Sequence, residues 1–388
     1  MYGRRRAIFN YVVEHSLGLA IGAAIALVWA NTGDAARYYR LAARLASPVN
    51  DVGMVFFFAL AAKEIVEATA PGGALHTWRR AALPVAAAVG GMLAPGLVYV
   101  ACVVYSRETV LMPGWAVPCA TDIAFAYLVA KLIYRDRRHP AIPFLLLLAI
   151  ADDALGLVIL AVFYPAGEVH PLIGSLLMAI ALVLSFGLRR AGVRSFWPYV
   201  ILGGPTSWAA FHYGGLHPAL ALVPVVPFLP HAARDAGLFV EAPPGARDAL
   251  NRFEHAFKYP VQVVLFFFGL ANAGVGVGAV GVGTWSVLIA IVLGKPIGIG
   301  LSVALAVAAG LRLSSAIGWK DIVVVGVTAG IGFTVALFFA IAAFPPGPIL
   351  EQLKLGALAS LGSAALALGA AAALGAGRFK RELTADSR

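Results

Sequence analysis

The sequence predicts an all-α membrane protein with about twelve transmembrane helices, two of which are broken near their middle. Composition is the first observation: 61% of residues are hydrophobic, 12% are charged, and mean hydropathy is +0.87. Soluble domains contain about 45–50% apolar and about 25% charged residues. Secondly, apolar runs of roughly 17–25 residues recur along the chain, without the alternation of β-barrel strands. Thirdly, two of these runs contain proline or glycine near their centre.

The apolar runs give the boundaries of the predicted spans. The first run is not expected to be a cleaved signal peptide, because no small-residue cleavage site ends it and further spans follow. The predicted spans are residues 11–30, 50–70, 81–104, 113–134, 141–164, 170–188, 196–212, 216–230, 257–277, 284–309, 320–344 and 351–375.

The net charge of +10 is explained by membrane topology. Connections between spans alternate between the two sides of the membrane, and basic residues are abundant in only one of these two sets. The poorer set holds only Arg37, Arg40, Arg44, Arg107 and Lys354, while Lys63, Lys131 and Lys295 lie within spans. Because cytoplasmic segments carry the excess of Lys and Arg, we expect both termini to be cytoplasmic. No nucleic-acid partner is predicted.

We expect residues 1–388 to form a single membrane domain. The longest hydrophilic connection, about 231–256, is too short to fold alone. Pro118 lies within the fourth span and Gly330 and Gly332 within the eleventh. These residues can simply kink a packed helix. Alternatively, the two spans are broken, and since they are seven apart they cross in opposite directions. Spans three to five and ten to twelve would then be inverted repeats with a binding site near the midplane.

Charged residues in the predicted membrane core are few. The fourth span contains Asp122, the fifth contains the adjacent Asp152 and Asp153, and the tenth contains Lys295. Adjacent helical residues project about 100° apart, so the two neighbouring acids cannot face the same partner. One can face an ion while the other faces Lys295. Intramembrane charges are expensive and usually functional, although a purely structural buried ion pair would explain Lys295 and one aspartate.

The chemistry of this set favours cation/proton exchange. Two coupled carboxyl groups can hold protons near neutral pH and release them when a cation competes for the same oxygens. Thr121 and backbone carbonyls at a helix break would add the neutral oxygen ligands that a hard cation prefers. Asp122 and Lys295 can also neutralise the partial charges at the ends of broken helices.

Several other residues have weaker functional signals. His217, Glu254 and His255 are candidates for a pH response, although such residues also occur simply at helix ends. Cys102 and Cys119 fit no metal-ligand spacing and are expected to pack. The glycine-rich segment after Asn272 is predicted to be an outside loop, because no strand precedes it and no acid follows at nucleotide-binding spacing.

The chain resembles the NhaA family of bacterial sodium/proton antiporters over about residues 15–345. The matching segments, in the family's order, are "VNDVGMVFFFALAAKEI", "RRAALPVAAAVGGMLAPGLVY", "GWAVPCATDIAFA", "AIADDALGLVILAVFY", "FGLANAGV", "GKPIGI" and "GIGFTVALFF". NhaA is itself a standard example of a broken-helix, inverted-repeat transporter, so the resemblance implies that fold as a known property.

The resemblance also implies roles for residues. Asp153 is implied as the principal Na⁺ ligand, Asp152 as its partner and the group paired with Lys295, and Thr121 and Asp122 as residues at the crossing of the broken helices. No cofactor is implied. Na⁺ or Li⁺ and H⁺ are the transported substrates, and a multi-pass homodimer in the bacterial inner membrane is expected. Transport would be electrogenic and regulated by pH.

Three departures from the family pattern stand out. Relatives have a glutamate near the cytoplasmic end of the second span, where this sequence has Lys63 followed by Glu64. This makes Glu64 a further pH-response candidate. Residues 31–46 are predicted to be helical, whereas relatives form a β-hairpin there and use it to dimerise. Val335 and Ala336 replace a pair that is more polar or bulkier in relatives.

Two rival functions follow from the same residues. A transporter of this fold can carry a different ion or lack exchange activity. An intramembrane aspartyl protease also uses two membrane aspartates, which must approach within about 3 Å. The chain lacks a "GxGD" segment, and a protease would have no evident use for Lys295.

Overall fold

The computed structural model describes residues 17–136, 139–231 and 248–379, and its described residues are all-helical apart from connections. Predictions for residues 1–16, 137–138, 232–247 and 380–388, which include most of the 231–256 connection, lie outside the described residues. The α-helices are α2 (Leu17–Ala30), α3 (Ala35–Ser47), α4 (Met54–Thr69), α5 (Trp78–Tyr105), α6 (Ile123–Ile133), α7 (Ala141–Phe163), α8 (Pro171–Arg190), α9 (Gly204–Tyr213), α10 (Ala249–Asn272), α11 (Val282–Ile289), α12 (Lys295–Ala308), α13 (Trp319–Ala329), α14 (Phe333–Ala343), α15 (Pro348–Ala359) and α16 (Ser363–Leu374).

Short π and 3₁₀ segments join or extend these helices. The π segments η1 (Pro48–Gly53), η3 (Tyr199–Gly203) and η7 (Ala290–Gly294) each run directly into the following helix. The 3₁₀ segments are η2 (Thr109–Cys119), η4 (Pro218–Leu220), η5 (Val226–Phe228), η6 (Val277–Ala279), η8 (Ser360–Gly362) and η9 (Gly377–Phe379).

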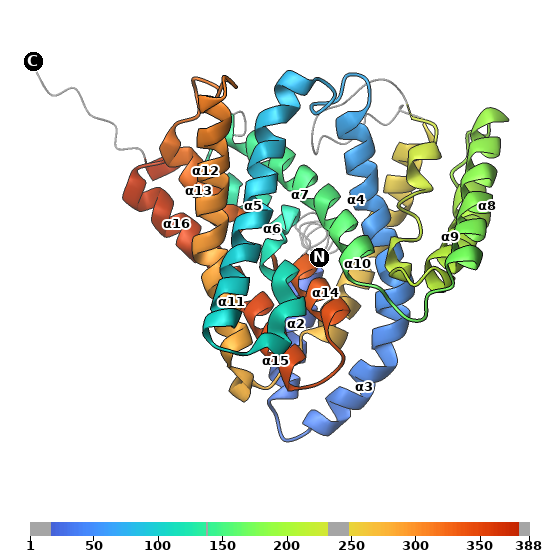
Figure 1. Ribbon diagram of the computed structural model, residues 1–388, viewed down its shortest axis with the longest axis horizontal. Coiled ribbons are helices and arrows are strands. Elements are labelled where there is room, and N and C mark those ends of the chain that lie inside the picture. The colour runs from blue at the N-terminus through green and yellow to red at the C-terminus, as the bar shows by residue number, and fades with distance from the viewer. Residues whose placement is uncertain (1–16, 137–138, 232–247, 380–388) are drawn as a thin grey trace, which may run out of the picture.

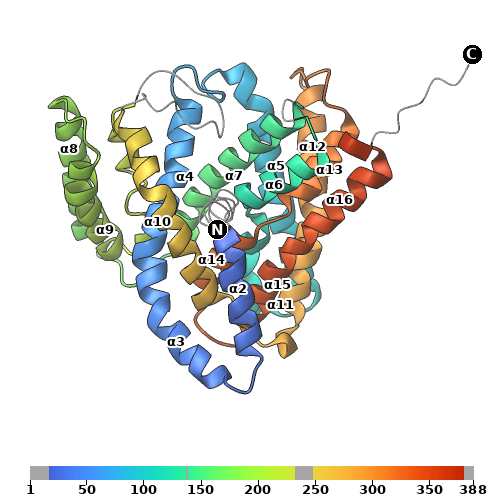
Figure 2. The same cartoon turned by 180° about the vertical axis from the view of Figure 1, so that it is seen from behind.

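The helices form one bundle with α7 running through its interior (Figure 1). Helices α8 and α9 lie at one flank, and α12, α13 and α16 lie at the opposite flank (Figures 1 and 2). Six helices are long and apolar enough to cross a membrane, or up to eight if each of two bent pairs counts as one crossing, within the described ranges. The molecule is therefore a multi-pass membrane protein.

The bent pairs coincide with the fourth and eleventh predicted spans. Segment η2 and helix α6 are bent by 53° at a short break, and α13 and α14 are bent by 48° at another. Both breaks fall where the sequence has proline or glycine beside polar residues: Pro118 in the first, Gly330 and Gly332 in the second. These interruptions free backbone groups in the bundle interior.

One predicted span differs from the structure. Residues 216–230 were expected to be a transmembrane helix, but they form only the short segments η4 and η5 joined by turns. The physical reason is the proline content: Pro218, Pro224 and Pro227 lack the N–H that a helical hydrogen bond requires. Most of this segment is nonetheless buried against the bundle.

Helices α5 and α12 cross in close contact because both present glycine to the crossing. A Cβ on Gly298 would overlap the carbonyl of Gly90, and a Cβ on Gly294 would lie 2.6 Å from the Cα of Pro95. Small residues allow close backbone approach between membrane helices. The crossing positions Lys295, the first residue of α12, beside the centre of α5.

Residues 35–47 are helical, as the sequence predicts, and they continue through η1 into α4 as one helix of 35 residues. A reciprocal amide pair fixes the change of direction at η1: Asn50 Nδ2 donates to Asn272 Oδ1 at 3.2 Å, and Asn272 Nδ2 donates to Asn50 Oδ1 at 2.8 Å. Both side chains are buried. This pair attaches η1 to the end of α10.

Candidate functional site

The two breaks in the bundle touch each other through their backbones. Asp122 N donates to the carbonyl of Ile331 at 2.6 Å, and the Thr121 hydroxyl donates to the carbonyl of Ala329 at 3.0 Å. Close packing requires glycine at position 332, since a Cβ there would lie 2.8 Å from the Ala120 carbonyl oxygen. The short connections within the two bent pairs therefore meet at one point, with Thr121 and Asp122 at the contact.

The Asp122 carboxylate accepts hydrogen bonds from N–H groups at the N-termini of two helices. Its Oδ1 accepts the N–H of Phe125 in the first turn of α6 at 3.3 Å. Its Oδ2 accepts the N–H of Thr334 in the first turn of α14 at 3.3 Å, together with the Thr334 hydroxyl. Each helix N-terminus carries roughly half a positive unit charge. This is the role that the sequence predicted for Asp122.

Lys295 lies between an acid and a helix end. Its ammonium is 3.2 Å from Asp152 Oδ2 and also donates to the carbonyl of Cys119, the last residue of η2. Both charged side chains are almost completely buried. The predicted pairing of Lys295 with one of the two adjacent acids is therefore present, and the lysine also offsets the negative end of a broken segment.

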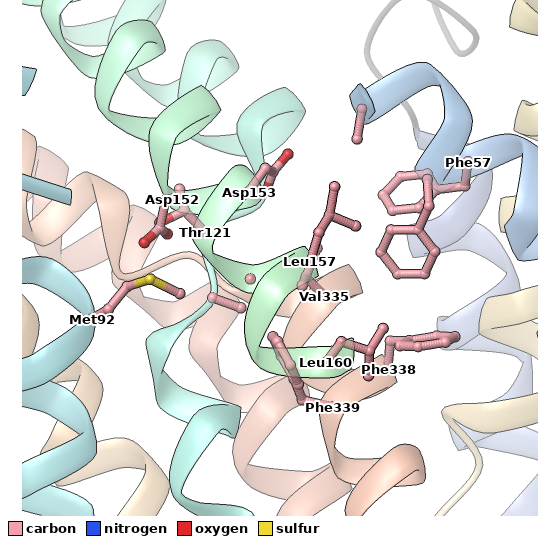
Figure 3. Close-up of a pocket in the computed structure, with 14 residues that line it drawn as sticks. Phe57, Met92, Thr121, Asp152, Asp153, Leu157, Leu160, Val335, Phe338 and Phe339 are labelled. Atoms are coloured by element: carbon pink, nitrogen blue, oxygen red, sulfur yellow. The ribbon is translucent and has the colours of Figure 1, made fainter. Parts of the chain in front are cut away.

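Asp153 points in a different direction from Asp152. Figure 3 shows Asp152 leaving α7 toward Met92 and Thr121, and Asp153 leaving on another side of the helix. Both line a pocket, together with Thr121, Phe57, Phe58, Ala61, Met92, Ala120, Gly156, Leu157, Leu160, Val335, Phe338 and Phe339. Within the described ranges, the Asp153 side chain forms no hydrogen bond or ion pair. Its carboxylate is thus available to a small ligand in the pocket.

The pocket offers oxygen ligands in an otherwise apolar wall. Asp152 Oδ1 is buried and has no hydrogen-bond partner among the described residues. With Asp153 and the Thr121 hydroxyl oxygen, it supplies carboxylate and neutral oxygens, the ligand types that hard cations bind. A buried carboxylate without a partner is unfavourable unless a proton or cation neutralises it. The arrangement therefore suits alternative occupation by H⁺ or a small cation.

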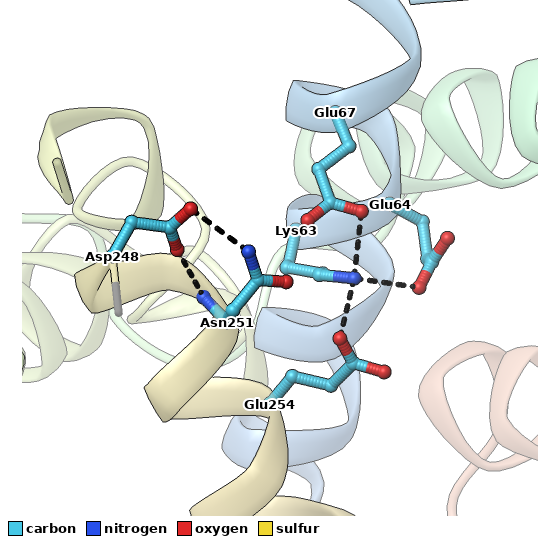
Figure 4. A network of polar contacts seen from close by, with 6 residues as sticks. All are labelled: Lys63, Glu64, Glu67, Asp248, Asn251 and Glu254. Carbon is cyan, nitrogen blue, oxygen red and sulfur yellow. Dashed lines mark hydrogen bonds and ion pairs between the residues drawn. The ribbon is translucent and has the colours of Figure 1, made fainter. Parts of the chain in front are cut away.

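A second charged cluster joins α4 to α10. The buried Lys63 ammonium lies 3.3 Å from Glu64, 2.7 Å from Glu67 and 2.6 Å from Glu254 (Figure 4). On the side of α10, the Asp248 carboxylate caps the helix by accepting the N–H and side-chain amide of Asn251, both at 2.8 Å. The predicted pH-response residues Glu64 and Glu254 thus both contact Lys63.

The two histidine candidates lie elsewhere. His217 is buried, accepts the N–H of Ala219 at its Nδ1, and has its ring 4.8 Å from that of Phe338, which lines the pocket. His255 is exposed on α10, next to Glu254. His217 is therefore close to the pocket wall, and His255 is only a sequence neighbour of the Lys63 cluster.

Some functional partners were not expected from the sequence. Thr334 donates hydrogen bonds to the Asp122 carboxylate, and the Cys119 carbonyl accepts a hydrogen bond from Lys295. Glu67 forms an ion pair with Lys63. Thr334 follows directly after the glycine-containing break, and Glu67 lies four residues after Lys63 on one helix face. These positions in the sequence could have identified Thr334 and Glu67 as partners. The contact with the Cys119 carbonyl depends on the path of the backbone and left no signal in the sequence.

The chain is similar to sodium/proton antiporters over nearly its whole length. The family model described as "Na+/H+ antiporter 1" matches residues 7–372. The "Na(+)/H(+) antiporter NhaA 1" of Pelobacter propionicus is 45% identical over 372 residues, covering 93% of this chain and 96% of the relative. The "Na(+)/H(+) antiporter NhaA" of Geobacter sulfurreducens is 43% identical over 375 residues, covering 94% and 97%.

A solved structure also shares the fold. The sodium proton antiporter MjNhaP1 from Methanocaldococcus jannaschii at pH 8 aligns with a TM-score of 0.54, covering 93% of this chain and 92% of that chain. The two sequences are 15% identical in this alignment. The two proteins are therefore similar in the arrangement of their helices and not in their sequences.

Proposed function

Because the chain belongs to the Na⁺/H⁺ antiporter 1 family and is a sodium/proton antiporter, we propose that its exchange site is the pocket beside Asp152 and Asp153. Na⁺ or Li⁺ binds to Asp153, Asp152 and Thr121, and protons take its place on the carboxyl groups. The observation that carries this assignment is that Asp153 has no ion-pair partner among the described residues, in a pocket whose other acid is paired with Lys295. No cofactor takes part.

The proposed cycle follows from competition for these oxygens. A cation arriving from the cytoplasm displaces protons, and the loaded crossing segments then expose the pocket to the other side. Two carboxyl groups and one lysine allow more than one proton per cation, so transport is electrogenic and moves protons inward. The pairs η2–α6 and α13–α14 move with α7 and α12 against the remaining helices.

The proposed arrangement in the membrane rests on charge and on repeated structure. Residues 1–388 form one transporter domain, with inverted repeats in the third to fifth and the tenth to twelfth predicted spans. Both termini lie in the cytoplasm of a bacterial cell, because the basic connections lie on that side of the inner membrane. The protein is a homodimer.

A vesicle experiment tests the exchange activity. Everted membrane vesicles from cells that produce this protein, with an imposed pH gradient, are given sodium, lithium, potassium or calcium at several pH values. We expect sodium and lithium to dissipate the gradient and potassium and calcium to have little effect. Vesicles from cells without the protein provide the baseline. A response to potassium or calcium alone would favour a transporter of the same fold with a different ion, and no response to any cation would favour a relative without exchange activity.

The protease alternative has less support. Both oxygens of Asp122 accept N–H groups at the starts of α6 and α14, so this carboxylate already has a capping role. An aspartyl protease needs two acids that share one proton. Asp152, the other fully buried acid, is paired with Lys295.

We also propose that the Lys63 cluster sets the response of transport to pH. The ammonium stabilises the ionised forms of Glu64, Glu67 and Glu254 and so holds α4 against α10. In Lys63→Gln, three carboxyl groups remain close together and repel one another without a cation between them, so proton binding by the cluster becomes more favourable than in the native protein. The pH of half-maximal sodium response in vesicles should rise by about one unit.

Lys131→Gln provides the matched control for this prediction. Lys131 is also a lysine within a predicted span, but it lies over the ring of Tyr127 rather than among acids. Its pH profile should match that of the native protein. A Lys63→Gln profile that superimposes on the native one would show that the cluster has no part in the pH response. His217→Gln and His255→Gln, examined in the same way, test the two histidine candidates.

A further inference from the structure

The helix that contains α3 is longer than a membrane crossing requires, and α3 is the part in excess. The continuous helix from Ala35 to Thr69 has 35 residues, about 52 Å at 1.5 Å per residue. About 20 residues suffice to cross the hydrocarbon core. The helix changes direction at η1, and Figure 1 shows α3 leaving α4 at an angle at one end of the bundle. In the proposed topology this is the outside surface of the membrane.

One face of α3 is attached to the protein. The hydroxyl of Tyr38 donates to the carbonyl of Leu270 at 3.0 Å and accepts the N–H of Gly274 at 3.0 Å. The Tyr38 side chain is 1% exposed, and Ala42, one turn later, is also buried. Helix α3 is therefore held in a fixed orientation on the end of α10.

The opposite face is basic. Arg37, Arg40 and Arg44 are exposed and follow one another at intervals of three and four residues, which places them on one side of the helix. Arg37 pairs with Asp34 at 3.2 Å, and α3 itself contains no acidic residue. Tyr39, on another side of the same helix, is 41% exposed, and aromatic rings of this kind are enriched at the level of lipid headgroups.

The number of basic residues on α3 is unusual among the segments assigned to the outside. Outside connections are poor in basic residues, and three of the five basic residues assigned to that side stand on this one helix face: Arg37, Arg40 and Arg44, against Arg107 and Lys354 elsewhere. The concentration of charge calls for an anionic partner. A second copy of the chain is a poor partner for this face, since a two-fold interface would bring the same arginines together.

We propose that the basic face of α3, formed by Arg37, Arg40 and Arg44, binds the phosphodiester headgroups of anionic phospholipids in the outer leaflet. Guanidinium groups match phosphate oxygens in paired hydrogen bonds, and a basic amphipathic helix in the plane of the interface has the geometry for such binding. The binding attaches the η1 end of α4 to the membrane surface. The inference rests on the proposed topology and not on the identity of the transported ion.

The test compares lipid binding by full-length variants. Purified protein is titrated in detergent with phosphatidylglycerol or with phosphatidylethanolamine, and bound lipid is counted by native mass spectrometry. In Arg40→Gln/Arg44→Gln we expect the affinity for phosphatidylglycerol to fall at least fivefold, with no change for phosphatidylethanolamine. Arg40→Lys/Arg44→Lys should retain part of the affinity. Arg79→Gln/Arg80→Gln, which removes two exposed arginines from the start of α5, should bind as the native protein does.

Three results would overturn the proposal. One is unchanged phosphatidylglycerol affinity in Arg40→Gln/Arg44→Gln, and another is an equal loss in the Arg79→Gln/Arg80→Gln control. The third is a shift from dimer to monomer in Arg40→Gln/Arg44→Gln with unchanged lipid binding, because the face would then contact a second copy. Thermal unfolding of each variant without lipid checks that α3 is folded.

Discussion

Replacing Asp153 with asparagine is expected to reduce the sodium response of everted vesicles to that of vesicles without the protein. The pocket wall is otherwise largely apolar, and Asp153 is the acid in it that has no ion-pair partner among the described residues. An amide carries no exchangeable acid proton at physiological pH and no negative charge for a cation. The variant therefore loses its binding of both competing substrates, H⁺ and Na⁺, at this position. Fluorescence of a pH-sensitive dye in the vesicles measures the effect.

Two further variants make this result specific. Glu168→Gln neutralises an acid whose side chain is 95% exposed on a connection, and its sodium response should equal that of the native protein. Asp153→Glu keeps the charge and should retain part of the activity at higher sodium concentration. Full activity of Asp153→Asn, with normal amounts of protein in the membrane, would place the exchange site elsewhere.

Lys295→Met is expected to produce the largest loss of stability. The side chain of Lys295 has no exposed surface and its partner Asp152 is 1% exposed, so the variant leaves an uncompensated acid inside the bundle. Removing one partner of a buried ion pair typically costs about 3–5 kcal/mol. The apparent melting temperature of the solubilised protein should fall by roughly 5 °C or more. The apparent sodium affinity should fall about tenfold, which corresponds to about 1.4 kcal/mol.

The double variant Asp152→Asn/Lys295→Met separates charge from packing. It removes both charges, and replacing a buried pair by neutral groups is often close to neutral for stability. Its melting temperature should therefore return most of the way to the native value, while its transport remains impaired because it lacks Asp152, a proposed cation ligand. A double variant no more stable than Lys295→Met would show that the loss comes from packing around the aliphatic chain of Lys295.

The contacts of the charged side chains in the pocket could be predicted from the sequence because charged residues are rare in its apolar runs. Near the middle of these runs, Lys295 and the three aspartates Asp122, Asp152 and Asp153 leave few possible pairings. The roughly 100° between adjacent helical residues separates the directions of Asp152 and Asp153. Proline and glycine beside Thr121, Asp122 and Thr334 marked the interruptions of the helices. Each of these signals is local, because it can be read from the residue itself and its neighbours in the sequence.

Other features depend on contacts that local patterns do not encode. The apolar character of residues 216–230 predicted a helix, although their prolines argued against one. Lys63 was identified as a departure from the family, but its position among three glutamates depends on how α4 packs on α10. The Cys119 carbonyl accepts from Lys295 only because η2 ends beside α12. Tertiary arrangement decided these outcomes.

The electrical behaviour of the antiporter follows from how the ends of its interrupted helices are neutralised. Asp122 travels with the helix starts that it caps, and Lys295 lies against the segment end that it offsets. Any displacement that keeps these contacts carries each fixed charge together with its counter-charge. The membrane voltage would then act mainly on the Asp153 carboxylate together with the ions bound to it. The voltage sensitivity of turnover would accordingly report the net charge of Asp153 with its bound sodium or protons.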